Sequence, residues 1–219
     1  MAAILLIPAA GIGSRLGRPE PKALVPVAGH PLLWWTLEAL APVQFRAIVV
    51  AAPPGRIADF ESILDGRGQV VAGGLTRSAS VRRAFEASGA EPGEVVCIHD
   101  AARPLVSPEE ATRVILTAER VGAAIAATPV VDTLKRVDSE KISNTVERDG
   151  LWAAGTPQAF RTGVLRQALA SGRETTDEAA LCEALSIPVA VVPVTRLGFK
   201  ITTPEDLEIA GAILESRAR

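Results

Sequence analysis

The sequence predicts an α/β protein with a single Rossmann-like, mostly parallel sheet and helices on both of its faces. Short apolar runs alternate with segments of helical period along the chain, as in successive β-α-β units. Most runs are apolar on consecutive residues, which is typical of strands covered on both faces. A length of 219 residues fits one domain, so residues 1–219 are expected to share a single core.

The first half of the chain alternates strands and helices from its beginning. Its strand runs are rich in Val, Ile, Leu and Ala, and its helical segments repeat apolar residues every three or four positions. The expected strands are residues 3–7, 46–52, 69–72 and 94–98, and the expected helices are residues 31–40, 56–64 and 77–87.

The second half continues the alternation, with clearer helix starts. Ser107 and Thr203 each precede a proline and two acidic residues, which is a strong signal for a capped helix. The expected helices are residues 108–120, 162–170, 176–185 and 204–215, and the expected strands are residues 122–127 and 189–194.

One segment departs from this pattern. Residues 130–146 alternate apolar and polar side chains about a polar turn at 138–141, which predicts a β-hairpin. A two-stranded hairpin is marginally stable alone. We therefore expect a β-arm over residues 130–148 that packs against a second subunit.

Composition narrows the classes of partner and compartment. The net charge of −2, from 23 basic and 25 acidic residues, argues against broad binding to nucleic acid or an anionic membrane. No apolar run approaches the ~20 residues that cross a bilayer, and the beginning of the chain lacks the basic region of a signal peptide. Cys97 and Cys182 stand outside any metal-binding spacing and are expected to be reduced core thiols. A cytoplasmic protein is expected.

The loop after the first strand is the strongest functional signal. Residues 8–17 (PAAGIGSRLG) are mostly small, so backbone N–H groups can approach a polyphosphate closely. Arg15 adds a planar fork of donors and Lys22 a compact positive charge. The loop lacks the Gly-Lys-Ser/Thr of a Walker motif, and Leu16 occupies the third glycine position of a dinucleotide fingerprint. It indicates a different kind of nucleoside triphosphate site.

A second signal follows the strand over 94–98. Asp100 comes just after this buried run, where one carboxylate can hold Mg²⁺ together with a nucleotide's phosphates. Arg103 suits a phosphate, and it equally suits a structural ion pair with Asp100. His99 is expected to be a packed neighbour and not a catalyst.

Two further segments complete the set. Gly73-Gly74 leads into a helix start rich in hydroxyl groups, which suits base, ribose or phosphate contacts, although Thr76 also fits an N-cap and Ser80 an ordinary first-turn residue. Lys200 ends a strand region just before the capped helix at Thr203.

Together these segments closely resemble the family of 2-C-methyl-D-erythritol 4-phosphate cytidylyltransferases of nonmevalonate isoprenoid biosynthesis. The resemblance spans nearly the whole chain in order. The matching segments are PAAGxGxR…PK at 8–22, GGxxRxxSV at 73–81, HDAARP at 99–104, Asp132-Thr133-Lys135, TVERDGLW at 145–152, TPQ at 156–158, TDEA at 176–179 and KITTPED at 200–206.

The resemblance implies a reaction and a site. CMP would pass from CTP to 2-C-methyl-D-erythritol 4-phosphate, giving 4-diphosphocytidyl-2-C-methyl-D-erythritol and pyrophosphate, in one nucleotidyltransferase domain. Arg15, Lys22 and Lys200 would stabilise the reacting phosphates, and Asp100 would help to hold Mg²⁺ or another divalent cation with CTP. The implied nucleotide contacts are Ala9, Ala10, Gly11, Gly13, Gly74, Ser80 and Asp100.

The resemblance also implies how the acceptor is held. Its contacts would be Arg103, Thr133, Arg148, Thr156 and Lys200. The arm over 130–148 would exchange between the subunits of a homodimer, carrying Thr133 and Arg148 to the partner's site.

One departure and several alternatives stay open. Family members often carry an acidic residue shortly before the lysine matched by Lys200, whereas this chain has TRLGF at 195–199. The chain ends soon after its last helix, so no fused cyclodiphosphate synthase domain is expected. The rival activities are a ribitol-5-phosphate cytidylyltransferase or another sugar-phosphate nucleotidyltransferase, and the rival without turnover is a nucleotide-sensing homologue.

Overall fold

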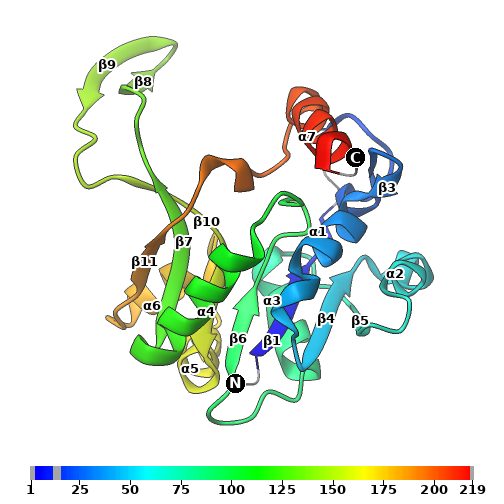
Figure 1. Ribbon diagram of the computed structural model, residues 1–219. Coiled ribbons are helices and arrows are strands. Elements are labelled where there is room, and N and C mark those ends of the chain that lie inside the picture. Colours follow the sequence, from blue (N-terminus) through cyan, green and yellow to red (C-terminus); the bar gives the residue numbers. More distant parts are fainter. Residues whose placement is uncertain (1–2, 12–15, 218–219) are drawn as a thin grey trace.

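A seven-stranded sheet forms the centre of the structure, a computed structural model in which residues 3–11 and 16–217 are described (Figure 1). Its strand order is β11-β7-β10-β6-β1-β4-β5. Neighbouring strands are parallel except at β10, which runs antiparallel to both β6 and β7. The predicted mostly parallel α/β sheet is therefore confirmed.

The elements follow in the order strand, helix, strand for most of the described chain. The strands are β1 (Ala3–Pro8), β2 (Pro26–Val27), β3 (His30–Pro31), β4 (Ala47–Ala52), β5 (Gln69–Ala72), β6 (Val95–Ile98), β7 (Ala123–Pro129), β8 (Leu134–Asp138), β9 (Lys141–Val146), β10 (Trp152–Arg161) and β11 (Ala190–Pro193). The α-helices are α1 (Leu32–Leu40), α2 (Ile57–Leu64), α3 (Arg77–Ala87), α4 (Pro108–Val121), α5 (Thr162–Ala170), α6 (Glu178–Ala184) and α7 (Pro204–Arg217). Short 3-10 turns are η2 (Lys22–Leu24), η3 (Ala41–Val43), η4 (Pro54–Arg56) and η5 (Arg196–Gly198). Each helix and strand expected from periodicity is found within about two residues of its predicted ends, as is usual for element boundaries.

Strand β10 is the principal element that the sequence did not reveal. It lies between β6 and β7, so these two strands are not adjacent as a simple β-α-β succession would have placed them. Its middle contains Gly155 and Pro157, residues that signal a loop because they weaken a strand or break its hydrogen bonding. The pairing with β7 does shift register between Ala154 and Gln158, and the glycine and proline lie within that irregularity.

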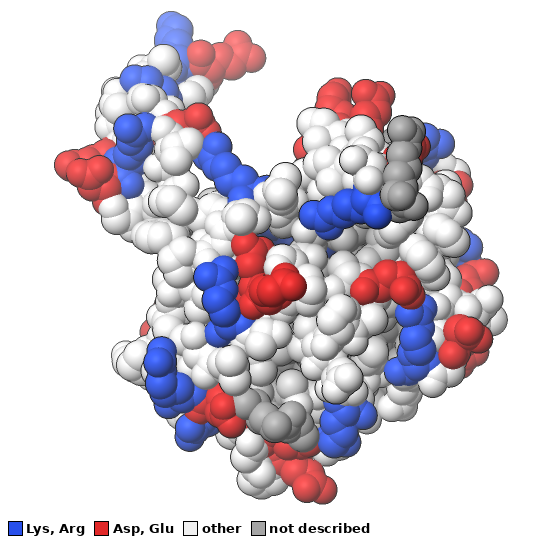
Figure 2. All heavy atoms as spheres, viewed as in Figure 1, with Lys and Arg blue, Asp and Glu red and all other residues white. Residues whose placement is uncertain are grey.

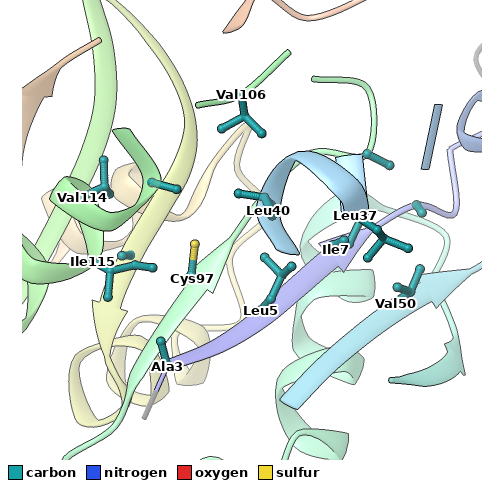
Figure 3. Close-up of a cluster of buried hydrophobic side chains, with 14 of the residues drawn as sticks. Ala3, Leu5, Ile7, Leu37, Leu40, Val50, Cys97, Val106, Val114 and Ile115 are labelled. Atoms are coloured by element: carbon teal, nitrogen blue, oxygen red, sulfur yellow. The ribbon is translucent and has the colours of Figure 1, made fainter. Parts of the chain in front are cut away.

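Alternate side chains of the sheet enter two separate cores. One core joins Leu5, Ile7 and Cys97 to α1, α2 and α4, and Figure 3 shows part of it. The other core joins Leu6 and Phe160 to α3, α5 and α6. Because neighbouring strand residues point to opposite faces, both faces of the sheet are covered by helices, as predicted.

A third, smaller core lies beyond the carboxyl ends of the strands. Ala210 and Leu214 of α7 pack with Val27, Leu32 and residues of the neighbouring loops. Ile201 belongs to this cluster and is fully buried. The cluster thereby fixes the backbone immediately after Lys200.

The predicted hairpin is present as β8 and β9. Figure 1 shows it projecting from the body of the molecule beyond the end of β7. Val137 and Ile142 are cross-strand partners, and their exposed fractions are 57% and 65%. We call residues 130–148 the arm.

The surface carries charges of both signs. Figure 2 shows acidic and basic side chains interspersed on the drawn face, with several of each sign on the arm. Within the described part of the chain, no helix combines the length and apolar character that a membrane span requires.

Candidate active site

Two cavities lie next to each other at the carboxyl edge of the sheet. The first has a volume of about 200 Å³ and the second about 350 Å³. Lys200 is the one described residue that lines both of them. Both cavities therefore lie beyond the carboxyl ends of the parallel strands, where ligands bind in sheets of this kind.

The loop after β1 and the turn η2 form one wall of the first cavity. Ala9, Ala10, Gly11 and Lys22, which the sequence assigned to a nucleotide site, line it. The backbone is held in place there, because Ala9 N–H donates to Ala51 O at 2.8 Å and Lys22 N–H donates to Gly11 O at 3.4 Å. Gly13 and Arg15, which the sequence also assigned to this site, lie outside the described residues.

Gly74, the second glycine of the pair after β5, lines the same cavity. A Cβ on Gly73 would lie 2.5 Å from the Ala10 Cβ, and a Cβ on Gly74 would lie 2.4 Å from the Ala79 Cβ. Only glycine fits these positions, since real Cβ atoms do not approach so closely. Gly74 N–H donates to Ser80 Oγ at 3.1 Å, and Thr76 is the N-cap of α3, so both hydroxyl groups hold the loop that lines the cavity.

Asp100 lies at the centre of a cluster of cations. Its carboxylate is 2.8 Å from Lys200 Nζ, 3.4 Å from Arg77 Nε and 3.7 Å from Arg103 Nε. Burial alone would raise the pKa of Asp100, but the three cations lower it well below its ordinary value. The Asp100–Arg103 ion pair that the sequence left open is present, and it is one part of a larger cluster.

The cluster continues to a residue with no predicted role. Glu178 is fully buried at the start of α6 and accepts two hydrogen bonds from Arg77 Nη1, at 2.8 and 2.9 Å. Burial raises the pKa of Glu178, and Arg77 opposes that effect. Arg77 itself lines the first cavity. Both residues lie in segments that the family resemblance matched, which is the one sequence signal that pointed to them.

Arg103 and Thr156, two of the expected acceptor contacts, lie in the wall of the second cavity. Arg103 Nη1 donates to Gly198 O at 2.8 Å, while its Nε is buried without a hydrogen-bond partner. Thr156 Oγ1 accepts from Asp100 N–H at 3.0 Å, which ties the irregular middle of β10 to the loop after β6. The neighbouring His99 is fully buried, and burial lowers its pKa to about 4, so its imidazole is neutral near pH 7.

The second cavity contains two charged residues that the sequence did not single out. Glu110, near the start of α4, and Arg196, in η5, both line it. Arg196 also lies 3.6 Å from Asp132 at the base of the arm, with both side chains largely exposed.

Thr133 and Arg148 are not brought to either cavity of their own chain. Both are exposed at the base of the arm, and Arg148 Nη1 donates to Val131 O. Their separation from the two cavities is what an arm that reaches another subunit requires.

The residues present fit a metal ion carried by a nucleotide better than a resident metal centre. Among the described residues no group of three or more His, Cys, Asp or Glu side chains could hold a metal ion. Asp100 is the one acidic side chain of the described lining of the first cavity. Mg²⁺ commonly takes one carboxylate and completes its shell with phosphate oxygens and water.

The arrangement suits a reaction between two phosphates. The first cavity offers small residues, backbone and the cations Lys22, Arg77 and Lys200, which suit a polyphosphate. The second offers Arg103, Arg196 and the same lysine. A lysine in the shared wall can lower the repulsion between two anions that meet there.

Comparison with known proteins agrees with this geometry. The family model described as 2-C-methyl-D-erythritol 4-phosphate cytidylyltransferase matches residues 3–216. The enzyme of that name from Thermus thermophilus is 43% identical over 218 residues, covering 97% of both chains. The one from Frankia casuarinae is 43% identical over 213 residues, covering 95% of this chain and 80% of its own. The crystal structure of the Thermus enzyme superposes with a TM-score of 0.84 at 41% identity, covering 97% of this chain and 98% of that one.

Proposed function

The chain belongs to the 2-C-methyl-D-erythritol 4-phosphate cytidylyltransferase family, and we propose that its two adjacent cavities hold the nucleotide and the acceptor of that family's reaction. The protein is an enzyme of isoprenoid precursor biosynthesis. It transfers CMP from CTP to 2-C-methyl-D-erythritol 4-phosphate, forming 4-diphosphocytidyl-2-C-methyl-D-erythritol and pyrophosphate.

The first cavity is the proposed nucleotide site. Ala9, Ala10 and Gly11 offer close backbone approach, and Gly74 and Ser80 form the facing wall near the base and ribose. Gly13 belongs to the same proposed loop. The second cavity, with Arg103 and Thr156, is the proposed site of methylerythritol phosphate.

The acceptor needs no general base to attack. The second pKa of a phosphate monoester is near ~6, so the group is mostly a dianion at neutral pH. One of its oxygens forms a bond to the α-phosphorus of CTP while the bond from that phosphorus to the bridging oxygen of pyrophosphate breaks. The barrier is mainly the repulsion between the two anions, together with charge that builds on the leaving group.

Cations around the junction of the cavities are proposed to lower that barrier. Lys200 stands where both phosphates meet, and Lys22 acts from the nucleotide side. Arg15, which precedes Lys22 in the same segment of the sequence, is proposed to assist it. Asp100 holds Lys200 at 2.8 Å and Arg77 at 3.4 Å, so these cations are in position before substrate arrives. The location of Lys200 in both cavity walls is the observation that carries the assignment.

A divalent cation, Mg²⁺ being the best fit, is proposed to accompany CTP. It would be held by the phosphates and Asp100, and it would supply additional positive charge on the triphosphate.

The arm is proposed to make the enzyme a homodimer. Val137 and Ile142 form an exposed apolar pair on a hairpin that extends from the body, and burial against a second copy would cover them. The same exchange would bring Thr133 and Arg148 to the acceptor site of the partner. Residues 1–219 are proposed to form one nucleotidyltransferase domain with the arm as a subregion, since the three cores of the described residues border the same sheet or its carboxyl edge.

A cytoplasmic location is proposed from the cysteines. Cys97 and Cys182 are free and buried, and burial raises the pKa of Cys97 to about 12. Thiols of this kind suit a reducing compartment and serve packing.

The test is a matrix of substrates. Pyrophosphate release is measured with CTP, UTP and ATP, each against methylerythritol phosphate, ribitol 5-phosphate and a sugar 1-phosphate, with and without Mg²⁺. The expected result is turnover with CTP and methylerythritol phosphate that requires the divalent cation. Turnover only with another acceptor would contradict the assignment of the second cavity, and turnover with no pair would favour a nucleotide-sensing protein.

A further inference from the structure

The second cavity has one negative side chain among several positive ones. Arg103, Arg196 and Lys200 supply its positive charge, and Glu110 is the one acidic residue of its described lining. A phosphate is drawn to the cations and is repelled by the carboxylate. An acceptor with a phosphate at one end therefore enters in one orientation.

Glu110 is buried but only partly satisfied. Its exposed fraction is 8%, and Oε1 accepts a hydrogen bond from Thr195 N–H at 2.6 Å. In the described part of the chain no hydrogen bond or ion pair reaches Oε2, and this oxygen is also absent from the buried polar atoms that lack a partner. Oε2 is therefore not fully buried, and Glu110 is one of the residues that line the second cavity.

The position of Glu110 in the first turn of α4 accounts for an acidic residue, because a negative charge is favourable at a helix N-terminus. It does not explain what Oε2 contacts. The N–H of Thr195 needs one acceptor, which a neutral amide would supply at a smaller desolvation cost. Oε2 has no protein donor among the described residues, so its donor is water or a molecule bound in the cavity. A polyol phosphate brings such donors, because each of its hydroxyl groups can give a short, charge-assisted hydrogen bond.

We propose that Glu110 determines acceptor specificity by accepting a hydrogen bond from a hydroxyl group of the polyol through Oε2. The inference rests on the proposed assignment of the second cavity to methylerythritol phosphate. Glu110 thus selects a hydroxylated acceptor and sets its direction, with the phosphate toward Arg103 and Lys200.

The same carboxylate also positions part of the site. It anchors Thr195, while Arg103 Nη1 anchors Gly198 three residues later, at 2.8 Å. Both anchors hold the segment that leads to Lys200. An experiment must therefore separate contact with the acceptor from support of this segment.

A double-mutant-type cycle, which combines a change in the enzyme with a change in the acceptor, distinguishes these two roles of Glu110. The kcat/KM for the acceptor is measured for the wild type and Glu110→Gln, with methylerythritol phosphate and with analogues that each lack one hydroxyl group. Gln keeps an oxygen for Thr195 N–H but removes the charge. Glu109→Gln is the matched control, since Glu109 is the preceding residue, is largely exposed and lines neither cavity.

For one analogue, the wild-type kcat/KM is expected to be roughly 10- to 100-fold lower than for methylerythritol phosphate. This is the usual range for loss of a hydrogen bond to a charged group. With methylerythritol phosphate, Glu110→Gln is expected to lower kcat/KM by a similar factor. With that analogue, the variant should be little worse than the wild type, and its KM for CTP should stay within about twofold of the wild-type value. Glu109→Gln should behave as the wild type.

Other results would overturn the inference. The effect of Glu110→Gln on kcat/KM could multiply with the effect of every analogue, or the variant could lose as much kcat/KM for CTP as for the acceptor. Either result would show that Glu110 only supports the segment before Lys200. If thermal unfolding shows that Glu110→Gln is not folded, Glu110→Asp is tested in the same cycle. Asp keeps the negative charge but has a shorter side chain, so its carboxylate no longer reaches the hydroxyl group of the acceptor. A wild type that does not turn over methylerythritol phosphate would refute the proposed function instead.

Discussion

Asp100 shows how one residue can organise a site without being free to act as an acid or base. Its carboxylate faces Lys200, Arg77 and Arg103 together, and its pKa lies well below the ordinary value because these cations favour the charged form. The residue is therefore ionised throughout the neutral range. Its main contribution is to hold cations where two phosphates would otherwise repel each other.

Lys22 allows a direct test of the nucleotide site. Lys22→Ala is expected to lower kcat by about 100- to 1000-fold, since one preorganised charge contact in an active site is commonly worth that much. Pyrophosphate release measures the loss, and thermal unfolding should stay near the wild-type midpoint. Arg15→Ala is expected to behave in the same way.

The matched control for Lys22→Ala is Arg120→Ala, which removes an exposed cation at the far end of α4. Near-normal turnover in Lys22→Ala, or an equal loss in the control, would refute the assigned role.

Glu178 allows a test of how its ion pair with Arg77 stabilises the charged cluster around Asp100. Glu178→Gln leaves Arg77 with half of its counter-charge in a largely buried setting, and the free energy of unfolding is expected to fall by roughly 2–4 kcal/mol. Chemical denaturation measures the change. A double variant with Arg77→Gln should recover part of the loss, because the unpaired charge is then gone. Additive losses in the double variant would mean that the two residues do not stabilise each other.

At the scale of elements, the sequence predicted what periodicity can reveal. The parallel strands and the helices follow from apolar runs and capping signals, and the arm follows from alternation about a polar turn. Strand β10 was not predicted, because its identity as a strand depends on pairing with β6 and β7 and not on its own pattern. Gly155 and Pro157, which hid the strand, occupy the irregular stretch that also carries Thr156.

The arm gives a prediction about assembly. Val137 and Ile142 face each other across β8 and β9, so they form an exposed apolar pair on the hairpin. Val137→Ser together with Ile142→Ser is expected to convert a dimer into a monomer and to reduce turnover with it, because Thr133 and Arg148 would no longer reach the partner. Light scattering after size exclusion measures the mass. Asn144→Ala on the same arm should leave the mass unchanged, and a double-serine variant of unaltered mass would show that the arm is not the interface.

At the scale of the whole molecule, the sequence pointed to several residues that line the two cavities, most of them because they follow predicted strands and Thr156 through the family resemblance alone. Lys22, Asp100, Arg103, Thr156 and Lys200 all line the cavities that the structure forms. Partnerships between distant segments could not be predicted from local patterns. Glu178 reaches Arg77 across the interface of α3 and α6, and Glu110 reaches Thr195 from another layer, so their roles depend on the assembled fold.

The free energy of unfolding of the whole protein should depend on pH because His99 is buried and neutral. The pKa of His99 is about 4 in the folded state because of burial, against an ordinary value of 6.5. The proton therefore binds the unfolded chain more readily. The contribution of neutral His99 to the free energy of unfolding is complete above pH 6.5 and is lost as the pH falls from there toward 4.

Between pH 7 and pH 5 that loss amounts to about 2 kcal/mol in the wild type. His99→Gln removes the titrating group, so its free energy of unfolding should lack this part of the pH dependence. Denaturant titrations of both proteins at the two pH values, without nucleotide or metal, measure the difference. An identical slope in the variant would show that His99 is not the group responsible.

The small core under α7 has a consequence for the time at which the site can exist. Gly11 and Lys200 line the same cavity, yet nearly the whole described chain lies between them, and Ile201 is buried against residues of the last helix. Contacts so distant in sequence form only after the intervening chain has been made. A ribosome-bound chain that has not yet released residues 200–217 would have the glycine-rich loop without its facing lysine. Catalytic competence should therefore arise only after residues 200–217 have left the ribosome and this helix has folded over the edge of the sheet.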